Sequence, residues 1–440
     1  MMNRRLASII GKTLLLWLGI GFYLIFSLNL FSGLHVPEVS LQKNGPVLFW
    51  QNGAIYTINP DGTNLTKITP ALRANQRFTA VSPGCHGLAP TPCMILVGHV
   101  LYHISGTSLP LPTLNGTEWL NAPASWSPDG VYLAYPVANS QTEERSLLLY
   151  NTREGVLTVA ANNVDESIQP AWSTGCVDGL LNNCYLAYRQ KLEVGNGGAK
   201  AAILNLGSNQ RQSWPWLGSA GHILKWSAAG ELYLGGQTGW FNVRDGSPAG
   251  PAFSAGMAAS FSPAGAYVAY SNLTALQQDK GRGIWLSPLA KLDTGASPVM
   301  KIRPSRLLPA RIFIAEAPLD ARGFTREAFW SPQGNVLAAF AGGQLVHYNL
   351  VEDRVSVWFQ TSAMDNLGSY AFSPLGDGLA LVEEQFLDNP EKPQHRLFIV
   401  YNSGEIVTLR ERSPDPVLLL AWLPGDYEKY LIPYKSGEIL

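Results

Sequence analysis

Short apolar runs separated by turn-forming residues recur along most of the chain. In the clearest example, Trp126-Ser127-Pro128-Asp129-Gly130 is followed directly by Val131-Tyr132-Leu133-Ala134-Tyr135. Pro cannot donate to a strand ladder and Gly adopts positive φ without steric cost, so the first segment is typical of a strand end and a tight turn. Large and small apolar residues then alternate, which favours a strand. The pattern predicts short antiparallel strands joined by hairpins.

This motif recurs at a regular spacing. A bulky residue followed by Ser-Pro or a near copy occurs at Val81, Trp126, Trp172, Trp226, Phe261, Trp330 and Phe372, with a weaker eighth copy at Trp422. Most successive copies lie about 35 to 55 residues apart, which is the period of a four-stranded propeller blade. We expect the aromatic members from Trp126 onward to pack between neighbouring blades, the alternative being contact with a ligand.

The two ends of the repeat region complement each other. The strand Pro46-Val47-Leu48-Phe49-Trp50 and the strands up to Thr69 lack a first strand of their own, while the copy at Trp422 is followed by only about one more strand. Joining these ends in one sheet would close the ring and remove exposed edges. The sequence therefore predicts an all-β, eight-bladed β-propeller over residues 46–440. Seven blades are the alternative, because the copy at Trp226 is short.

The N-terminal segment is typical of a membrane anchor. Leu14 to Phe31 is an uncharged run of 18 residues, close to the length that crosses a bilayer as a helix. Arg4, Arg5 and Lys12 precede it and no basic residue follows until Lys43, which by the positive-inside rule orients the chain. We expect a cytoplasmic segment 1–13, one transmembrane signal-anchor helix 14–34, a linker 35–45 and an extracytoplasmic propeller. A cleaved signal peptide is the alternative, but Phe31 to His35 offers no small-x-small cleavage site.

Composition narrows the classes of partner. Charged residues make up 14% of the chain and the net charge is −1, so nothing indicates a general attraction to nucleic acid. The 13 Trp, 43 Gly and 30 Pro residues suit short strands and tight turns.

Four cysteines form two pairs of identical spacing, Cys85 with Cys93 and Cys176 with Cys184. Each first cysteine follows a Ser-x-Gly at the repeat turn, and each second cysteine opens the next predicted strand. Each pair thus flanks an enlarged turn, where a disulfide would stabilise the fold by about 2–3 kcal/mol. Disulfides also match an extracytoplasmic compartment. Unpaired buried thiols are the alternative, and zinc is disfavoured because the spacing is not one that zinc sites use.

The run from Trp126 to Tyr135 resembles the signature of the TolB-type, or WD40-like (PD40), propeller repeat. Ile55 to Thr69 is similar to the third and fourth strands of that repeat. The resemblance covers about residues 45–440 and implies the architecture rather than a site. Because the predicted anchor is followed almost directly by the repeats, we expect no counterpart of the N-terminal partner-binding domain of TolB. Asp-Gly is also replaced in several copies, as at Gln333-Gly334.

Motifs that would carry chemistry are missing or weak. No G-x-S-x-G elbow is present, and Gly11-Lys12-Thr13 runs into the predicted anchor rather than forming a phosphate loop. His99 and His103 lie four residues apart without a nearby acidic partner. We therefore predict no catalytic, cofactor-binding or metal-binding residues and no cofactor.

Long inserts on a rigid repeat are where binding usually resides. Three candidates are 271–283, 287–326 and 383–396, and plausible rim carboxylates are Asp320, Glu327, Asp365, Glu383 and Glu384. The basic segment 301–311 could meet an acidic partner.

The expected function is a non-catalytic binding or scaffold module in the cell envelope, for a protein, peptide or glycan. A propeller enzyme with a site in the central channel and a sensor or assembly subunit of an envelope complex are the alternatives. The sequence leaves the oligomeric state open.

Overall fold

The computed structural model describes most of the repeat region. The described residues are 44–69, 78–89, 91–120, 122–177, 180–192, 198–217, 223–227, 229–236, 239–249, 259–263, 265–271, 284–288, 329–341, 344–352, 354–360, 365–385 and 393–427. They contain strands and two short 3-10 helices, η1 (Pro83–His86) and η2 (Leu181–Asn183). Within these residues no helix has the length and apolarity to cross a membrane. The predicted anchor lies outside them.

The strands of the described residues form eight antiparallel sheets, numbered here from the one that contains the first strand. Sheet 1 contains β32 (Val417–Pro424), β1 (Asn44–Gln51), β2 (Ala54–Ile58) and β3 (Thr66–Lys67), and sheet 2 contains β4 (Phe78–Val81), β5 (Met94–Val97), β6 (Val100–His103) and β7 (Ser108–Pro110). In sheet 3, β8 (Thr117–Trp119) and β9 (Ser125–Trp126) both pair with β10 (Tyr132–Asn139), which is followed by β11 (Arg145–Asn151) and β12 (Val156–Asn162). Sheet 4 contains β13 (Ala171–Trp172), β14 (Tyr185–Lys191), β15 (Ala199–Asn205) and β16 (Arg211–Pro215). Sheet 5 contains β17 (Ile223–Trp226), β18 (Leu232–Gly236), β19 (Gly239–Asn242) and β20 (Pro248–Ala249), and sheet 6 contains β21 (Ala259–Phe261), β22 (Tyr267–Ser271) and β23 (Ile284–Pro288). Sheet 7 contains β24 (Phe329–Trp330), β25 (Val336–Ala341), β26 (Gln344–Asn349) and β27 (Arg354–Gln360). Sheet 8 contains β28 (Asp365–Phe372), β29 (Gly378–Gln385), β30 (Gln394–Tyr401) and β31 (Ile406–Ser413).

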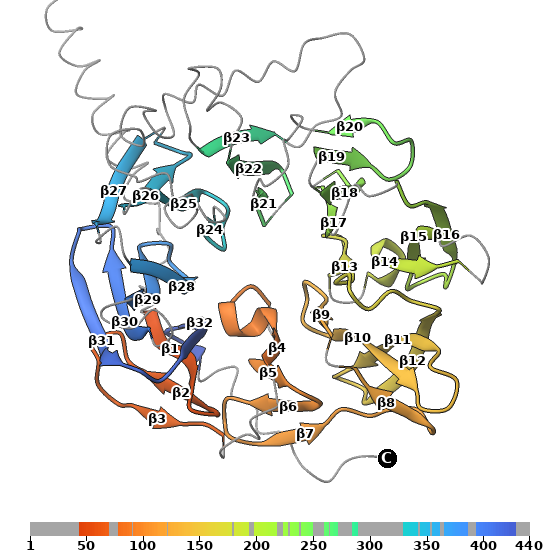
Figure 1. Ribbon diagram of the computed structural model, residues 1–440, viewed down its shortest axis with the longest axis horizontal. Helices are drawn as coiled ribbons and strands as arrows, with labels where there is room; N and C mark the ends of the chain where they lie inside the picture. The colour runs from red at the N-terminus through yellow and green to blue at the C-terminus, as the bar shows by residue number, and fades with distance from the viewer. Residues whose placement is uncertain are drawn as a thin grey trace, which may run out of the picture. The chain divides into compact units, whose positions relative to one another are not determined.

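The buried core lies between successive sheets. Separate apolar clusters join sheets 1 and 2, 2 and 3, 3 and 4, and 4 and 5. The ring of Trp240 meets that of Phe261 edge-on at 4.0 Å between sheets 5 and 6. Further clusters join sheets 6 and 7, 7 and 8, and finally 8 and 1. Each sheet is therefore packed on two neighbours, as Figure 1 shows, and the all-β fold is propeller-like.

Sheet 1 combines strands from both ends of the repeat region. β32 pairs antiparallel with β1, with Val47 opposite Trp422. The Trp422 side chain is fully buried, and its Nε1 donates to the Gly45 carbonyl at 2.9 Å. A Cβ on Gly45 would lie 2.2 Å from the Pro424 carbonyl oxygen, so the two strands approach closely only because this residue is glycine. Strands from the two ends of the repeat region are therefore hydrogen-bonded to each other in one sheet.

Tryptophan N–H groups connect neighbouring sheets. Trp172 Nε1 donates to the Ser125 carbonyl at 3.2 Å, Trp226 Nε1 to that of Ala171 at 3.0 Å, and Trp330 Nε1 to that of Ser260 at 3.3 Å. Each acceptor is the residue just before the repeat aromatic of the preceding sheet. Equivalent positions of successive first strands therefore lie side by side.

The repeat aromatics differ in how deeply they are buried. Trp126, Trp172, Trp226, Phe372 and Trp422 are buried, whereas Phe261 and Trp330 are half-buried. Phe261 and Trp330 flank sheet 6, for which the described residues include only three strands.

In each of the first seven repeat copies, the serine closes the turn from the first to the second strand. All seven serines are buried. Their Oγ atoms accept a backbone N–H from the start of the second strand, from Met94, Tyr132, Tyr185, Glu231, Tyr267, Val336 and Gly378. In three turns the hydroxyl also donates to a side-chain oxygen, of Asp129 at 2.5 Å, Asn335 at 2.9 Å and Asp377 at 2.6 Å. The hydroxyl thus satisfies groups that the turn would otherwise leave unpaired.

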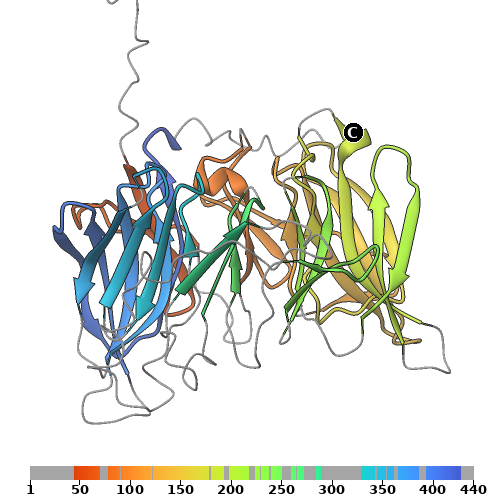
Figure 2. The same cartoon turned by 90° about the horizontal axis from the view of Figure 1, so that it is seen from above.

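These turns lie at one end of the sheets. Because strands alternate in direction, the turn between the third and fourth strands of a sheet lies at the same end as the turn between the first and second. We call this end the turn face; it comprises the turns after Ser82, Ser127, Ser173, Ser227, Ser262, Ser331 and Ser373 and the third-to-fourth-strand turns. A Cβ on Gly130 would lie 2.1 Å from Thr91 Oγ1, so turns of adjacent sheets touch. Figure 2 shows η1 (orange) and the start of β1 (red) at the same edge.

The inter-sheet hydrogen bond gives a stability prediction. Trp172→Phe removes the donor to Ser125, whereas Trp126→Phe removes a buried N–H that has no hydrogen-bond partner among the described residues. Both rings are buried to a similar degree, so the loss of volume is matched. We expect Trp172→Phe to lower the free energy of unfolding by about 1 kcal/mol more than Trp126→Phe, measured by urea denaturation. Equal losses would contradict the structural role of this bond.

Candidate functional site

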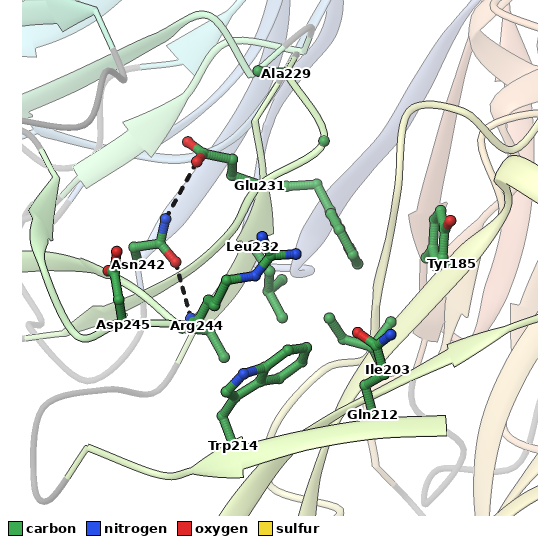
Figure 3. Close-up of a pocket in the computed structure, with 13 residues that line it drawn as sticks. Tyr185, Ile203, Gln212, Trp214, Ala229, Glu231, Leu232, Asn242, Arg244 and Asp245 are labelled. Carbon is green, nitrogen blue, oxygen red and sulfur yellow. Dashed lines mark hydrogen bonds between the residues drawn. The ribbon is translucent and has the colours of Figure 1, made fainter. Parts of the chain in front are cut away.

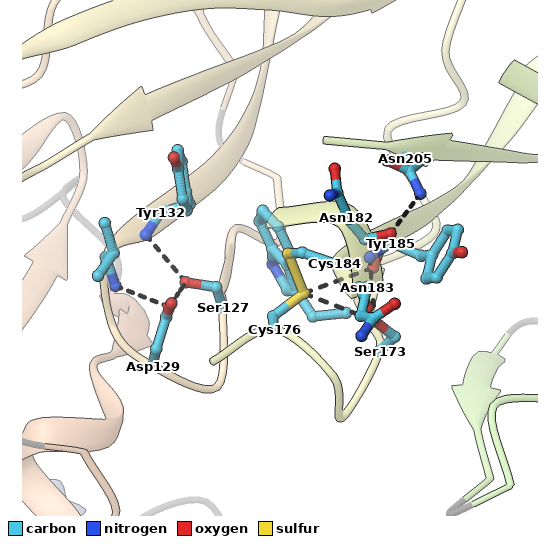
Figure 4. The surroundings of a disulfide bond; sticks show 12 residues. Ser127, Asp129, Tyr132, Ser173, Cys176, Asn182, Asn183, Cys184, Tyr185 and Asn205 are labelled. Carbon is cyan, nitrogen blue, oxygen red and sulfur yellow. Dashed lines mark hydrogen bonds between the residues drawn. A yellow bond between two sulfur atoms is a disulfide. The ribbon is translucent and has the colours of Figure 1, made fainter. Parts of the chain in front are cut away.

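Both predicted disulfides are present. Cys85 is bonded to Cys93, and Cys176 to Cys184, each across eight positions of sequence. Each closes a loop on the turn face that contains a short 3-10 helix, η1 in sheet 2 and η2 in sheet 4. Figure 4 shows the second loop beside the ordinary turn after Ser127, where Asp129 binds the serine hydroxyl. In the second loop, Cys176 Sγ lies 3.6 Å from the Ser173 Oγ, whereas in the turn after Ser127 the serine hydroxyl contacts Asp129.

A groove of about 400 Å³ opens on the turn face between sheets 4 and 5 (Figure 3). Gln212 and Trp214 on β16 form one wall, and the turn that carries Arg244 and Asp245 forms the other. Its lining also includes the apolar side chains of Ile203, Leu232 and Val243, together with Tyr185, Trp226, Glu231 and Asn242. The volume falls in the range of small-molecule sites, and the mixture of apolar floor and polar rim is typical of them.

Hydrogen bonds hold the polar wall of the groove in place. Asn242 Oδ1 accepts the Arg244 backbone N–H at 2.9 Å, and Asn242 Nδ2 lies 3.4 Å from Glu231 Oε1. Glu231 also accepts the Tyr233 hydroxyl at 2.5 Å. Burial, and then this bond to a carboxylate, raises the pKa of Tyr233 far above its ordinary value, so its proton stays in place at neutral pH.

The exposed guanidinium of Arg244 extends from this wall beside the Trp214 indole, as Figure 3 shows. Trp214 is half-buried, so part of its surface remains available. An aromatic ring, a guanidinium, an amide and two carboxylates thus converge on an apolar floor. This set of groups can bind a ligand that has both hydroxyl groups and an apolar face.

A second groove of about 310 Å³ occupies the equivalent place between sheets 3 and 4. The register of the strands identifies the equivalent positions. Tyr132 in sheet 3 corresponds to Tyr185 in sheet 4 at the start of the second strand, and Thr158 corresponds to Gln212 on the fourth strand. Alanines replace Trp214, and Gly207 and Ser208 replace Arg244 and Asp245. The repeat alone therefore creates a groove. The first groove adds Trp214, and its lining has three charged residues, Glu231, Arg244 and Asp245, whereas the lining of the second has one, Glu154.

The two histidines singled out by spacing do not meet. His103 is buried, with its Nδ1 2.6 Å from Ser105 Oγ, whereas His99 is exposed in the turn after β5. Within the described residues, no cluster of three or more His, Cys, Asp or Glu side chains could hold a metal ion.

Glu383 is buried rather than at the rim, contrary to the sequence-based expectation. Its Oε2 lies 2.8 Å from Arg396 and 3.5 Å from Arg412. It pairs across β29 and β30, where a buried carboxylate requires an opposite charge. Asp320, Glu327, the basic segment 301–311 and most of the three inserts lie outside the described residues, so their place is not assigned.

The sequence did not indicate the groove. Neither Trp214 nor the segment 242–247 belongs to a recognisable motif. The one available signal is the repeat alignment, in which the third-to-fourth-strand turn of sheet 5 carries Arg-Asp where that of sheet 4 carries Gly-Ser.

Comparison with known proteins gives no family. No family model and no curated protein matches the chain. Among solved structures, prolyl oligopeptidase B from Galerina marginata is 12% identical, with 77% of this chain and 52% of that chain covered and a TM-score of 0.46. A eukaryotic initiation factor is 12% identical, covering 85% and 98%, with a TM-score of 0.45. An oligogalacturonate lyase from Vibrio parahaemolyticus is 11% identical, covering 82% and 100%, with a TM-score of 0.42. The resemblance to TolB-type repeats stays a prediction.

The disulfides give a second stability prediction. Cys176→Ser with Cys184→Ser removes a short covalent loop from the unfolded state, so we expect the free energy of unfolding to fall by about 2–3 kcal/mol. Urea denaturation of the variant and of the parent protein measures this difference. Addition of reductant should destabilise the parent further than the variant, which has lost one of the two bonds. An unchanged midpoint would contradict the prediction.

The half-buried side chain of His347 makes the stability of the fold depend on pH. Its ring stacks on Trp358 at 4.3 Å, and burial, then the nearby Arg354, lowers its pKa from 6.5 to about 4. The unfolded chain therefore binds a proton that the folded chain does not between these values, and stability falls as the pH drops from 6.5 towards 4. We expect His347→Gln, whose amide can still reach Ser356, to lose less stability than the parent on this acidification. Equal losses, measured by urea denaturation at both pH values, would refute it.

Proposed function

We propose that this chain is a membrane-anchored, extracytoplasmic β-propeller of eight blades that binds a glycan of the cell envelope without transforming it. The observation that carries the proposal is the groove between sheets 4 and 5. It is built on paired strands and bonded turns, so recognition requires little ordering.

The blade number is supported by the sheets themselves. The described residues form eight of them, and apolar clusters or ring contacts join each to the next, including the last to the first. The weak copy at Trp422 contributes β32, which is the first strand of sheet 1. Counting this copy as a blade start therefore gives eight rather than seven.

The location is supported by the sequence and by the disulfides. The uncharged run from Leu14 to Phe31 and its flanking basic residues are typical of a signal-anchor. Disulfides persist mainly in oxidising compartments outside the cytoplasm, and both cysteine pairs are bonded. These two features agree on the same side of the membrane.

The side chains of the groove favour a glycan. Sugars present an apolar ring face, which packs on an aromatic side chain such as Trp214, and hydroxyl groups that pair with amides, carboxylates and guanidinium. Gln212, Arg244 and Asp245 supply these groups at the groove rim. A peptide or protein segment is the rival occupant, and a role as a sensor or assembly subunit would then follow.

The test compares the two equivalent grooves. An array of bacterial envelope oligosaccharides, probed with the detergent-solubilised full chain, identifies a bound glycan, and calorimetry then gives its affinity. We expect Trp214→Ala to weaken binding at least about tenfold, which corresponds to about 1.4 kcal/mol. Thr158→Ala, at the second-groove position equivalent to Gln212, is the control and should change nothing.

Three outcomes count against this proposal. Binding that survives Trp214→Ala would place the site elsewhere. Conversion of the oligosaccharide into products would favour the enzyme alternative. Failure of every glycan, together with a protein captured by the groove, would favour the rival occupant.

A further inference from the structure

We propose that the turn face lies against the surface of the lipid bilayer that holds the anchor, with the two disulfide-closed loops inserted among the lipid headgroups. This inference rests on the anchor in the proposed function and adds which end of the propeller contacts the membrane and through which residues.

Large apolar side chains are exposed on this face. Leu88 in the first disulfide loop is 54% exposed, and Leu180 in the second is 55% exposed. The others on the same face are Leu65, Val156, Val177, Leu181, Val351, Leu375 and Ile406. At the opposite end, Leu192 and Ile223 are exposed.

The distribution of these side chains fits a flat apolar medium. They come from sheets 1, 2, 3, 4, 7 and 8, so they are spread around the face rather than gathered in one patch. A protein partner would require a continuous apolar core to its interface. A bilayer offers apolar material beneath its headgroups at every point, which suits separate aliphatic contacts.

The disulfides fix the loops that carry the most exposed leucines. η1 ends at Gly87, whose φ of 67° turns the chain directly before Leu88. Leu180 precedes η2 in the loop closed by Cys176 and Cys184. A loop held in this way gives up little conformational freedom when it inserts, so more of the apolar gain is kept.

The point at which the predicted anchor joins the sheets places the turn face, rather than the opposite end, near the membrane. Asn44 begins β1, and β1 is the second strand of its sheet, so the chain enters the sheets at the turn face and runs away from it. The nine residues 35–43 connect the predicted anchor to Asn44 and reach at most about 35 Å. This tether keeps the face close to the membrane, and weak insertion of a few leucines is then sufficient.

Charge on the turn face is mixed. Asp61, Glu154, Glu352 and Glu405 are exposed there, and so are Lys67, Arg153, Arg244 and Arg354. The two signs offset one another, so the contact depends on apolar insertion and not on headgroup charge.

The experiment uses the full chain reconstituted in phosphatidylcholine vesicles that contain a photoactivatable diazirine phosphatidylcholine. Illumination followed by mass spectrometry locates the lipid adducts. We expect adducts within residues 85–93 and 176–184. The triple variant Leu88→Glu, Leu180→Glu, Leu181→Glu should reduce them at least fivefold. Leu192→Glu with Ile223→Glu is the matched control at the opposite end and should leave them unchanged. Thermal melting verifies that both variants fold.

The outcomes separate this inference from the anchor itself. Alkaline carbonate washing that releases the chain from the vesicles would overturn the anchor and the inference together. A retained chain whose adducts lie at the opposite end, or nowhere outside the anchor, would overturn the inference alone. So would adducts that increase when phosphatidylglycerol is added. In native membranes, a zero-length crosslink from these loops to a protein would assign the face to a protein partner instead.

Discussion

The contact between first strands of successive sheets determines the rest of the structure. At three of these contacts a tryptophan ring packs against the neighbouring first strand, and its N–H donates to a backbone carbonyl there, as Trp172 does to Ser125. Because the acceptor is a main-chain atom at a fixed repeat position, the contact sets both the spacing and the relative height of two sheets. Small residues at the acceptor positions, such as Ala171 and Ser260, allow this approach. Because neighbouring sheets have the same height, their turns lie side by side and together form the turn face, with grooves between adjacent sheets.

Much of the fold could be predicted because each repeat contains its own local signals for strands and turns. Trp-Ser-Pro-Asp-Gly and a following alternating run specify a strand end, a turn and a strand without reference to distant residues. The cysteine pairs were predictable for the same reason, since Cys176 and Cys184 flank a single turn. The role of the repeat serines was not predicted. Their hydroxyls act through hydrogen bonds to the backbone of the next strand, as Ser331 does at Val336, and a pattern of apolar residues does not contain that information.

The candidate site was not predictable because its two walls come from different sheets. Trp214 lies on the outermost strand of sheet 4, and Arg244 lies in a turn of sheet 5, so only the packing of the sheets brings them together. The sequence directed attention to long inserts instead. The candidate groove involves a short turn, in which Arg244 and Asp245 stand where sheet 4 has Gly-Ser. Sheet 3 has Arg153 and Glu154 at the same position, so the sequence of the turn alone does not mark a site, and its combination with Trp214 of the neighbouring sheet is visible only in the structure.

The pairing of β1 with β32 also bears on the proposed attachment of the protein through its N-terminus. β1 lies between β2 and β32, so force applied through Asn44 acts on two ladders at once. An N-terminal strand at a sheet edge would detach by breaking one row of hydrogen bonds from its end. The buried Trp422 ring and its bond to Gly45 further tie the point of attachment to the last strand. Among the described residues of the turn face, sheet 5 contributes none of these exposed aliphatic residues, so in the proposed contact with lipid the groove would stay open on its sheet 5 side. The proposed lipid contact and the proposed ligand site are therefore compatible on one face.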